Sequence, residues 1–548
     1  MKAAILSNIN LFKLIHKMKK KMEIYEPEGY GNWVQPLLGD KKLADYIICI
    51  IDGNQLFRSA LHAEDREEAF RRIEEYSSYI KNSAKKHPQS KYLVSDMDIL
   101  PDAIYPLKEI GYPQDLEYAW GSALGSIAAE LPNVFIFPLK DIIAGIGRER
   151  AYSNKMWYLA SSRFSVQGEQ EIGEKIFRLI SCLEGNRKKC LLLDLDNTLW
   201  GGVIGEDGIE GITLSENKEG ARYKDFQKKI KDMEKLGVLL GIISKNNEED
   251  AKDMIENHPD MVLRWDDFAV KKINWKRKSQ NIQEIQKELN IGFDSMVFLD
   301  DNPAEREEVK HSLPEIVVPE FPENTSRLSD FIEEIYWQYF LLPKATDEDK
   351  NKTALYHQRR EREQEREGHA SLESYLESLR TKVIVQPVGK TDIGRTVQLI
   401  QKTNQFNVTT KRYPEGEILD MLRQPDRYDF WIAEISDKFG NNGKSALLII
   451  EKEKEKITLD SFIMSCRVMG RDIEKDLLHA LEKRYLQKGY KTLETIYRRT
   501  AKNKPVADLY DKMGYLLMKD KEDEKHYIWI LQEREFISYS KIQWKDIC

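Results

Sequence analysis

Two aspartates stand two residues apart directly after an apolar run, in the stretch DLDNTLWGG (194–202). In an extended chain alternate residues share a face, so the carboxylates of Asp194 and Asp196 can point the same way. Two adjacent carboxylates repel each other unless a cation or a shared proton neutralises them. Mg²⁺ prefers oxygen ligands and bridges to substrate phosphate. With one carboxylate attacking phosphorus and the other moving a proton, the pair predicts magnesium-dependent phosphoryl transfer through an aspartyl phosphate.

Further polar residues of the same chemistry occur over the next hundred positions. Ser244 ends GIISKNN, where a hydroxyl and a backbone N–H can hold phosphate. Lys276 and Lys278 precede an expected helix, and one ammonium there would neutralise the oxygens of a transferring phosphoryl group. Asp300 and Asp301 end a third apolar run and can complete a metal shell. An acidic pair alone is weak evidence, but four ordered elements together favour a phosphoryl-transfer site over incidental surface acids.

The elements that must position these residues form an α/β pattern between 185 and 345. Apolar runs at 190–196, 238–244 and 295–301 are typical of buried strands, and helices are expected at 218–236 and 279–289. Parallel strands separated by helices build a doubly wound sheet whose ligands lie at the carboxyl ends of the strands. All three polar clusters fall at such ends, so we expect them to converge on one site.

This order of residues resembles the haloacid-dehalogenase (HAD) phosphotransferase superfamily. DLDNTLWGGVIGEDG, SKNNEEDA, NHPDMVL, FAVKKINW and LDDNPAERE further resemble its FkbH-like branch. The resemblance covers nearly the whole chain and is strongest over 190–310. It implies Asp194 as nucleophile, Asp196 as general acid/base, and Mg²⁺ as cofactor. The implied phosphate-binding residues are Thr198, Ser244 and Lys278, and the implied metal ligands are Asp194, Asp196, Asp300 and Asp301.

The branch is associated with loading a glyceryl unit from 1,3-bisphosphoglycerate onto an acyl carrier protein, with release of phosphate. The resemblance therefore implies a bifunctional glyceryl transferase and phosphatase with a small phosphorylated substrate and a carrier-protein partner, as in polyketide biosynthesis. Two alternatives stay open: a simple phosphatase of another small metabolite, and a carrier-binding scaffold with a vestigial site.

Residues 1–184 predict a second α/β domain with a parallel sheet, from runs at 3–6, 46–52 and 134–139 and a charged helix at 64–84. Serine, glycine and asparagine follow in the order of an SGNH hydrolase. The residues that carry this likeness are Ser7, Asn8, Gly31, Asn32, Asp52, Gly53 and Asn54. Such a hydrolase needs a late histidine as base, and AYSNKMWYLASSRFS (151–165) has none. We expect an SGNH-like scaffold without hydrolase activity.

Residues 346–378 carry a charge run whose signs nearly cancel, which favours a solvated linker helix. From 379 to 548 the pattern becomes α+β, with strands expected at VIVQPV, FWIAEI, ALLIIEK and ITLDSFIMS. The turn at Arg467, Gly470 and Asp472 is similar to the pyrophosphate-binding turn of N-acetyltransferase (GNAT) folds. Asp472 departs from that pattern, since an acid would repel pyrophosphate, and a phosphopantetheine arm would tolerate it better than coenzyme A.

Cys466 directly precedes this turn in SCRVMGR, which matches the family's segment. A helix dipole with Arg467 or Arg471 nearby would favour the thiolate, which could then carry the glyceryl group. A buried structural cysteine explains the residue equally well. Asn404 and Gln405, in TNQFN, either orient the acyl group or the pantetheine, with Arg467, Gly470 and Arg471, or simply turn the chain.

The chain of 548 residues has a net charge of −7, too mild a balance to indicate nucleic-acid binding. Its five cysteines are scattered and form no C-x-x-C pair, which disfavours a disulfide framework or a clustered zinc site. No stretch approaches the ~20 apolar residues of a membrane helix, and the interrupted N-terminus lacks signal-peptide character. We expect a soluble cytoplasmic protein with reduced thiols and no membrane or nucleic-acid partner.

Overall fold

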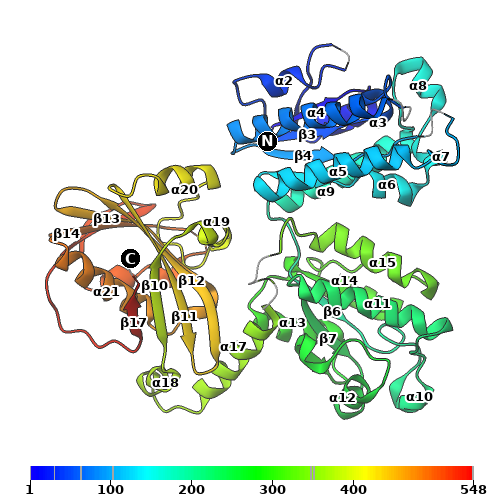
Figure 1. The fold of residues 1–548 in the computed structure, drawn as a ribbon. Coiled ribbons are helices and arrows are strands. Elements are labelled where there is room, and N and C mark those ends of the chain that lie inside the picture. The colour runs from blue at the N-terminus through cyan, green and yellow to red at the C-terminus, as the bar shows by residue number, and fades with distance from the viewer. Residues whose placement is uncertain are drawn as a thin grey trace. The chain divides into compact units, whose positions relative to one another are not determined.

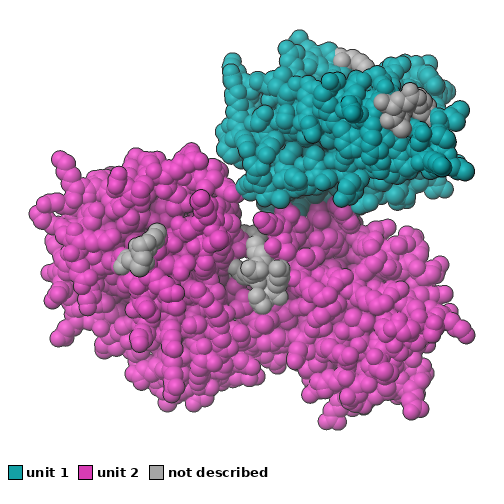
Figure 2. Space-filling model, viewed as in Figure 1, with its two compact units in different colours: residues 1–186 teal, residues 187–548 magenta. Residues whose placement is uncertain are grey.

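The computed structural model describes residues 2–29, 31–61, 65–100, 104–345, 349, 352–500 and 502–545, without the side chains at 359, 402 and 466. The chain divides into two compact units, residues 1–186 and residues 187–548 (Figure 2). No helix in the part of the chain that the structure describes is long and apolar enough to span a bilayer.

The first unit is a five-stranded parallel sheet in the order β2-β1-β3-β4-β5 (Figure 1). Its parallel α/β character agrees with the sequence pattern. The strands are β1 (Lys2–Ser7), β2 (Glu23–Tyr25), β3 (Tyr46–Ile50), β4 (Lys91–Ser95) and β5 (Val134–Phe137). The helices are α1 (Phe12–Lys19), α2 (Gln35–Leu38), α3 (Gly53–Leu56), α4 (Arg66–Lys86), α5 (Tyr112–Glu130), α6 (Leu139–Ile146), α7 (Arg148–Ala151), α8 (Asn154–Ala160) and α9 (Val166–Leu183).

The second unit begins with a four-stranded parallel sheet in the order β8-β7-β6-β9. The chain leaves β6 for β7 and β8 on one side and returns to β9 on the other, so the order reverses between β6 and β9. The strands are β6 (Cys190–Leu193), β7 (Leu239–Ser244), β8 (Phe268–Ile273) and β9 (Met296–Leu299). The helices are α10 (Ile204–Gly211), α11 (Lys218–Lys235), α12 (Glu248–Asn257), α13 (Lys278–Leu289), α14 (Pro303–Ser312) and α15 (Leu328–Ile335).

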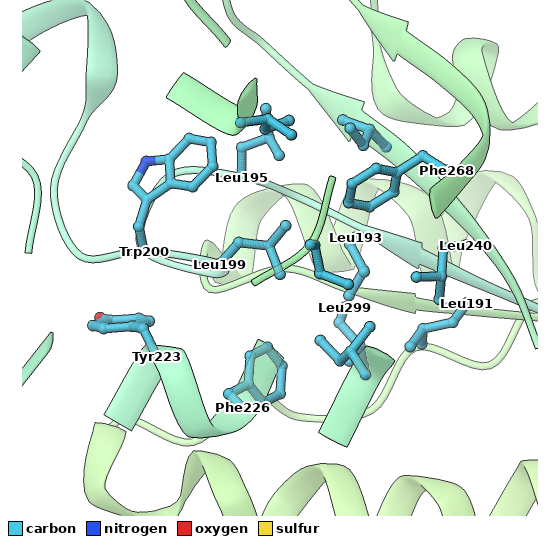
Figure 3. Packing of buried hydrophobic residues seen from close by; sticks show 14 of the residues in the cluster. Leu191, Leu193, Leu195, Leu199, Trp200, Tyr223, Phe226, Leu240, Phe268 and Leu299 are labelled. Atoms are coloured by element: carbon cyan, nitrogen blue, oxygen red, sulfur yellow. The ribbon is translucent and has the colours of Figure 1, made fainter. Parts of the chain in front are cut away.

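Strand alternation explains the two faces of this sheet. Leu191 and Leu193 pack into the core on the side of α11 and α15, while Cys190 and Leu192 pack on the opposite side with α13 and α14. Both faces are covered, which is why the strand reads as a continuous apolar run. Figure 3 shows the first of these cores, where Leu193, Leu195, Leu199 and Leu299 gather with Phe226 of α11.

The rest of the second unit is an eight-stranded mixed sheet, which agrees with the predicted α+β pattern. Its order is β15-β16-β14-β13-β12-β11-β10-β17. The strands are β10 (Lys382–Pro387), β11 (Tyr428–Asp437), β12 (Gly440–Lys452), β13 (Lys456–Met464), β14 (Thr492–Arg498), β15 (Leu516–Asp520), β16 (Glu524–Ile530) and β17 (Lys541–Trp544). The helices are α17 (Lys352–Glu367), α18 (Leu372–Leu379), α19 (Ile393–Lys402), α20 (Glu415–Leu422), α21 (Ile473–Gln487) and α22 (Leu509–Lys512).

The charge run before this sheet differs from the single solvated linker helix expected for 346–378. It forms two helices, α17 and α18, and α17 packs one face against the protein. Arg362 of α17 is 2% exposed and donates to both carboxylate oxygens of Asp437, at 2.7 and 2.9 Å. The burial of Arg362 is not apparent from the charge run, because its partner lies 75 residues further along the chain. Residues 346–348, 350 and 351 lie outside the described part.

Asp437 is fully buried between two guanidinium groups, since Arg471 also donates to it at 2.8 Å. We expect Asp437→Asn to lower the free energy of unfolding of this part of the chain by about 3–5 kcal/mol, because it removes the carboxylate charge that two buried guanidinium groups share. Urea denaturation followed by circular dichroism measures the change. The exposed Asp420, paired with Arg423, supplies the control, and Asp420→Asn should cost at most about 1 kcal/mol. Equal effects of the two substitutions would contradict this account.

Candidate active site

The predicted carboxylates of Asp194, Asp300 and Asp301 come together at the carboxyl ends of β6 and β9. Each of the three offers an oxygen atom, and these atoms lie within 4.8 Å of one another. Asp194 follows β6 by one residue, and Asp300 and Asp301 follow β9. The cluster therefore sits where the strand order reverses, the position at which doubly wound sheets bind ligands.

Lys278 reaches this cluster from the first residue of α13. Its Nζ lies 3.1 Å from Asp194 Oδ1 and also contacts Asp300, and its side chain is 3% exposed. Burial acts to lower the pKa of the Lys278 ammonium, but the charges of Asp194 and Asp300 outweigh it, and the pKa is raised. Lys278 therefore brings a fixed positive charge to the place where phosphate oxygens would lie.

The cluster keeps a net negative charge even with this lysine. Three carboxylates facing one ammonium leave two negative charges without compensation. Burial, followed by the charge of Asp194, raises the pKa of Asp300 to about 6 and also raises that of Asp301. An all-oxygen donor set with this excess of negative charge fits Mg²⁺, which Asp194, Asp300 and Asp301 would hold. The ion would supply charge neutralisation at the phosphoryl group.

Asp196 takes a separate position, held by three N–H donors. Its Oδ1 accepts from Trp200 Nε1 at 2.9 Å and from the backbone N–H of Ile204 at 3.1 Å. Its Oδ2 accepts from Asn246 Nδ2 at 2.9 Å. This carboxylate is oriented by the protein rather than gathered into the acidic cluster, an arrangement suited to proton transfer. Its predicted role as a metal ligand stays a prediction.

Ser244 and Thr198 flank the cluster. Ser244 ends β7, is 2% exposed and accepts a hydrogen bond from Asn246 at 3.2 Å, so Asn246 joins the serine to Asp196. The Thr198 hydroxyl accepts from the backbone N–H of Asp301 at 3.2 Å and ties the loop after β6 to the end of β9. Phosphate binding by either hydroxyl stays a prediction.

Sequence reasoning missed Trp200 and Asn246 as partners of Asp196. Trp200 lies four residues after Asp196 and Asn246 two residues after Ser244, so both are within the quoted motifs. Their spacing alone does not reveal that they meet the same carboxylate. That contact depends on the register of β6 against β7, which places the two strand ends side by side.

The loss of one of these donors should slow any phosphoryl transfer at this site without changing the acidic cluster. We expect Asn246→Ala to lower kcat by about 10–100-fold, because a carboxylate displaced by an ångström loses much of its effect. Steady-state phosphate release measures kcat, and calorimetry should give an unchanged affinity for Mg²⁺. Asn257→Ala, at the exposed end of α12, is the control and should behave as wild type. A wild-type kcat in Asn246→Ala would show that this contact does not position Asp196.

In the C-terminal sheet, β13 and β14 pair only from Lys456 to Leu459, and beyond this they separate. The segment 406–408 takes up the edge of β13 there: Met464 N donates to Phe406 O at 3.0 Å, and Val408 N donates to Phe462 O at 3.2 Å. It also meets β14, because Arg498 N donates to Val408 O at 2.8 Å. The predicted TNQFN segment therefore lies beside the strand that leads to Cys466.

The other predicted binding residues of this part take varied positions. Asn404 is exposed and accepts from Arg412 Nη2 at 2.7 Å, and Gln405 is partly exposed. Arg467 lies in the 3-10 turn η7 (Cys466–Val468), where burial lowers its pKa to about 10. Gly470 has a φ of +75°, which suits glycine, and Arg471 is engaged by Asp437. The side chain of Cys466 lies outside the described part, and its predicted role stays a prediction.

The strand ends of the first unit hold buried polar contacts at the positions predicted for an SGNH-like scaffold. Asn8 and Asp52 exchange two hydrogen bonds of 2.9 Å, and Asp52 lies 3.3 Å from the guanidinium of Arg163. Ser7 Oγ accepts from the backbone N–H of Ile9 at 3.2 Å. These contacts join β1, β3 and the segment before α9 into one structure. The likeness to SGNH hydrolases stays a prediction.

No family model matches the chain, and no curated protein matches it. Among solved structures it is similar to the N-terminal part of protein BF1531 from Bacteroides fragilis, which contains a phosphatase domain complexed with Mg. The identity is 28% and the TM-score 0.57, over 63% of this chain and 94% of that one.

Weaker likenesses concern acetyltransferases. The ribosomal-protein-S18-alanine N-acetyltransferase of Escherichia coli matches at 16% identity and a TM-score of 0.23, over 28% of this chain and 96% of that one. An acetyltransferase from Thermus thermophilus matches at 15% identity with the same TM-score, over 28% and 99%. At these values the likenesses carry no conclusion about activity. Of these likenesses, the one to the magnesium-bound phosphatase-domain structure bears on function.

Proposed function

We propose that the chain is a magnesium-dependent phosphatase built on Asp194, Asp196, Lys278, Asp300 and Asp301. One observation carries this proposal: two buried carboxylates, a third that is half-buried, and one buried ammonium converge at the switch point of a doubly wound sheet. The similarity to a phosphatase-domain structure complexed with Mg supports it. Asp194 would attack phosphorus, and the bond from phosphorus to the leaving-group oxygen would break as Asp196 donates a proton to that oxygen. Water would then hydrolyse the aspartyl phosphate with Asp196 as the base, and inorganic phosphate would leave.

We further propose that this phosphatase acts together with glyceryl transfer from 1,3-bisphosphoglycerate to an acyl carrier protein. The Cys466 thiolate would attack the acyl carbonyl carbon, the bond from that carbon to the phosphate oxygen would break, and inorganic phosphate would leave. The resulting thioester retains a phosphate ester, which the Asp194 centre would hydrolyse. The carrier's thiol would then take the glyceryl group and free Cys466. Support comes from the FkbH-like motifs and from the segment 406–408 beside β13.

The test is the intact mass of the protein after incubation with Mg²⁺ and 1,3-bisphosphoglycerate. We expect an adduct of glyceryl size on the wild type that is missing from Cys466→Ala, and its transfer to an added acyl carrier protein. Phosphate release without an adduct, unchanged in Cys466→Ala and unaffected by the carrier, would leave a phosphatase alone. Neither adduct nor phosphate release would contradict both proposals and favour a binding scaffold.

A further inference from the structure

A short loop joins β8 to α13 and is attached at both ends to the candidate phosphoryl-transfer site. At its start, Asn274 N donates to the carbonyl oxygen of Ser244 at 3.1 Å. At its end comes Lys278, whose Nζ lies 3.1 Å from Asp194. The three residues between these points, Trp275 to Arg277, therefore lie at the border of the site.

The backbone of this loop is braced from within. Asn274 Oδ1 accepts from Lys276 N and from Asn281 Nδ2, both at 3.0 Å, and Asn281 is fully buried. The side chains of the loop are therefore displayed from a fixed backbone. Such a support is what a binding residue needs, because little conformational entropy is lost on association.

Two side chains of the loop face solvent without packing partners. Trp275 is 76% exposed, and among the described residues it makes no ring stacking or cation–π contact. Arg277 is exposed, and no carboxylate in the described part of the chain pairs with it, whereas Lys276 is paired with Glu284 at 2.8 Å. A single exposed apolar residue needs no explanation. An exposed indole and a free guanidinium two residues apart, beside buried catalytic groups, are a combination suited to binding.

Two other helices that start next to the site, α10 and α12, carry the opposite charge. Ile204, the first residue of α10, donates to Asp196, and α12 begins four residues after Ser244. The first turns of these helices display exposed carboxylates, from Glu206, Asp207, Glu248, Glu249 and Asp250. An anionic substrate is repelled on those sides. The β8–α13 loop offers a cation without an ion pair among the described residues, and this cation could bind a second anionic group of a molecule whose phosphate lies against Lys278.

We infer that Arg277 and Trp275 bind the part of the phosphorylated substrate that is not transferred. Arg277 pairs with a second anionic group, a carboxylate or a phosphate, through two parallel N–H donors. The indole of Trp275 covers the short carbon skeleton between the two anionic groups. This inference rests on the proposed phosphatase for the identity of its ligand, and it concerns the free phosphorylated substrate, which has not formed a thioester. The expected substrates are molecules that carry an anionic group at each end.

Equilibrium dialysis with two probes tests the inference. 3-Phosphoglycerate carries a phosphate and a carboxylate, and glycerol 3-phosphate carries the phosphate alone. In the presence of Mg²⁺, on an Asp196→Asn background that slows turnover, we expect Arg277→Ala to weaken 3-phosphoglycerate binding by about 10–100-fold. Binding of glycerol 3-phosphate should change by about twofold or less. Arg277→Lys should recover part of the loss, since it restores charge without the two-pronged geometry. Trp275→Ala should weaken both probes, because each presents a carbon skeleton to the indole.

Lys276→Ala is the matched control, since Lys276 is the neighbouring exposed cation, and it should leave the ratio of the two affinities unchanged. If Arg277→Ala leaves the ratio of the two affinities unchanged while the wild type releases phosphate in a magnesium-dependent reaction, the role of the loop is overturned and the proposed phosphatase stands. If Arg277→Ala loses the preference for 3-phosphoglycerate over glycerol 3-phosphate but the wild type releases no phosphate, the binding role of the loop stands and the proposed phosphatase is overturned. Failure of the wild type to bind either probe would overturn both.

Discussion

Replacement of Asp194 by Asn is expected to lower kcat for magnesium-dependent phosphate release by roughly 10⁴-fold, as when other enzymes lose a nucleophile. An amide is a much poorer nucleophile than a carboxylate, and it also removes one charge from the acidic cluster. KM is expected to change less than kcat, because Lys278 and Ser244 remain. Steady-state phosphate release over a range of substrate and Mg²⁺ concentrations separates the two effects.

The matched control for this change is Glu206→Gln, which also converts a carboxylate to an amide. Glu206 lies in the first turn of α10 and is exposed, outside the acidic cluster. Its substitution should leave kcat within about twofold of the wild type, as for other surface changes. Full phosphate release by Asp194→Asn at saturating Mg²⁺ would exclude Asp194 as the nucleophile.

Loss of Lys278 should produce the second large effect, on stability as well as on rate. In the metal-free protein, Lys278→Ala leaves the carboxylates of Asp194 and Asp300 buried without their ammonium. We expect the free energy of unfolding to fall by about 3–5 kcal/mol. Saturating Mg²⁺ should narrow this difference, because the ion replaces the missing positive charge and binds only the folded state. The rate should remain about 10²–10³-fold low, since the ion does not replace a donor to the transferring phosphoryl group.

Urea denaturation with and without Mg²⁺ measures the predicted rescue. Lys276→Ala is again the control, because Lys276 is 55% exposed in its pair with Glu284 and should contribute at most about 1 kcal/mol. Equal stability of Lys278→Ala and wild type in the absence of metal would contradict the account of the cluster. A stability loss that Mg²⁺ leaves unchanged would mean that Lys278 acts through packing rather than through charge.

The four-stranded sheet β8-β7-β6-β9 and its candidate site were largely predictable, because the apolar runs of the strands and the chemistry of the site point to the same residues. A strand covered on both faces is a run of apolar residues, and the polar residue that follows it lies at the ligand-binding end. Asp194, Ser244 and Asp300 each follow such a run. The convergence of three of the predicted residues, Asp194, Lys278 and Asp300, follows from the strand order β8-β7-β6-β9.

Other features were beyond the reach of local patterns. The strand β8 has the sequence FAVKKI, and its two lysines interrupt the apolar run by which a buried strand is recognised. An edge strand such as β8 needs apolar side chains over only part of its length. The burial of Arg362 depends on Asp437, and the support of Asp196 depends on Asn246, which is 50 residues away. In each case a contact between distant positions decides the role of a side chain, and sequence spacing does not contain it.

The most direct test of the central claim is capture of the phosphorylated enzyme. With [³²P]acetyl phosphate the leaving group is a carboxylate, a weak base that needs no proton from Asp196. In Asp196→Asn, attack by Asp194 should therefore proceed while hydrolysis of the intermediate slows. Acid quenching should trap magnesium-dependent label on the peptide that contains Asp194, and the label should be absent from the Asp194→Asn, Asp196→Asn double variant. Magnesium-dependent phosphate release with no label at Asp194, or with label retained in the double variant, would contradict phosphoryl transfer through this aspartate.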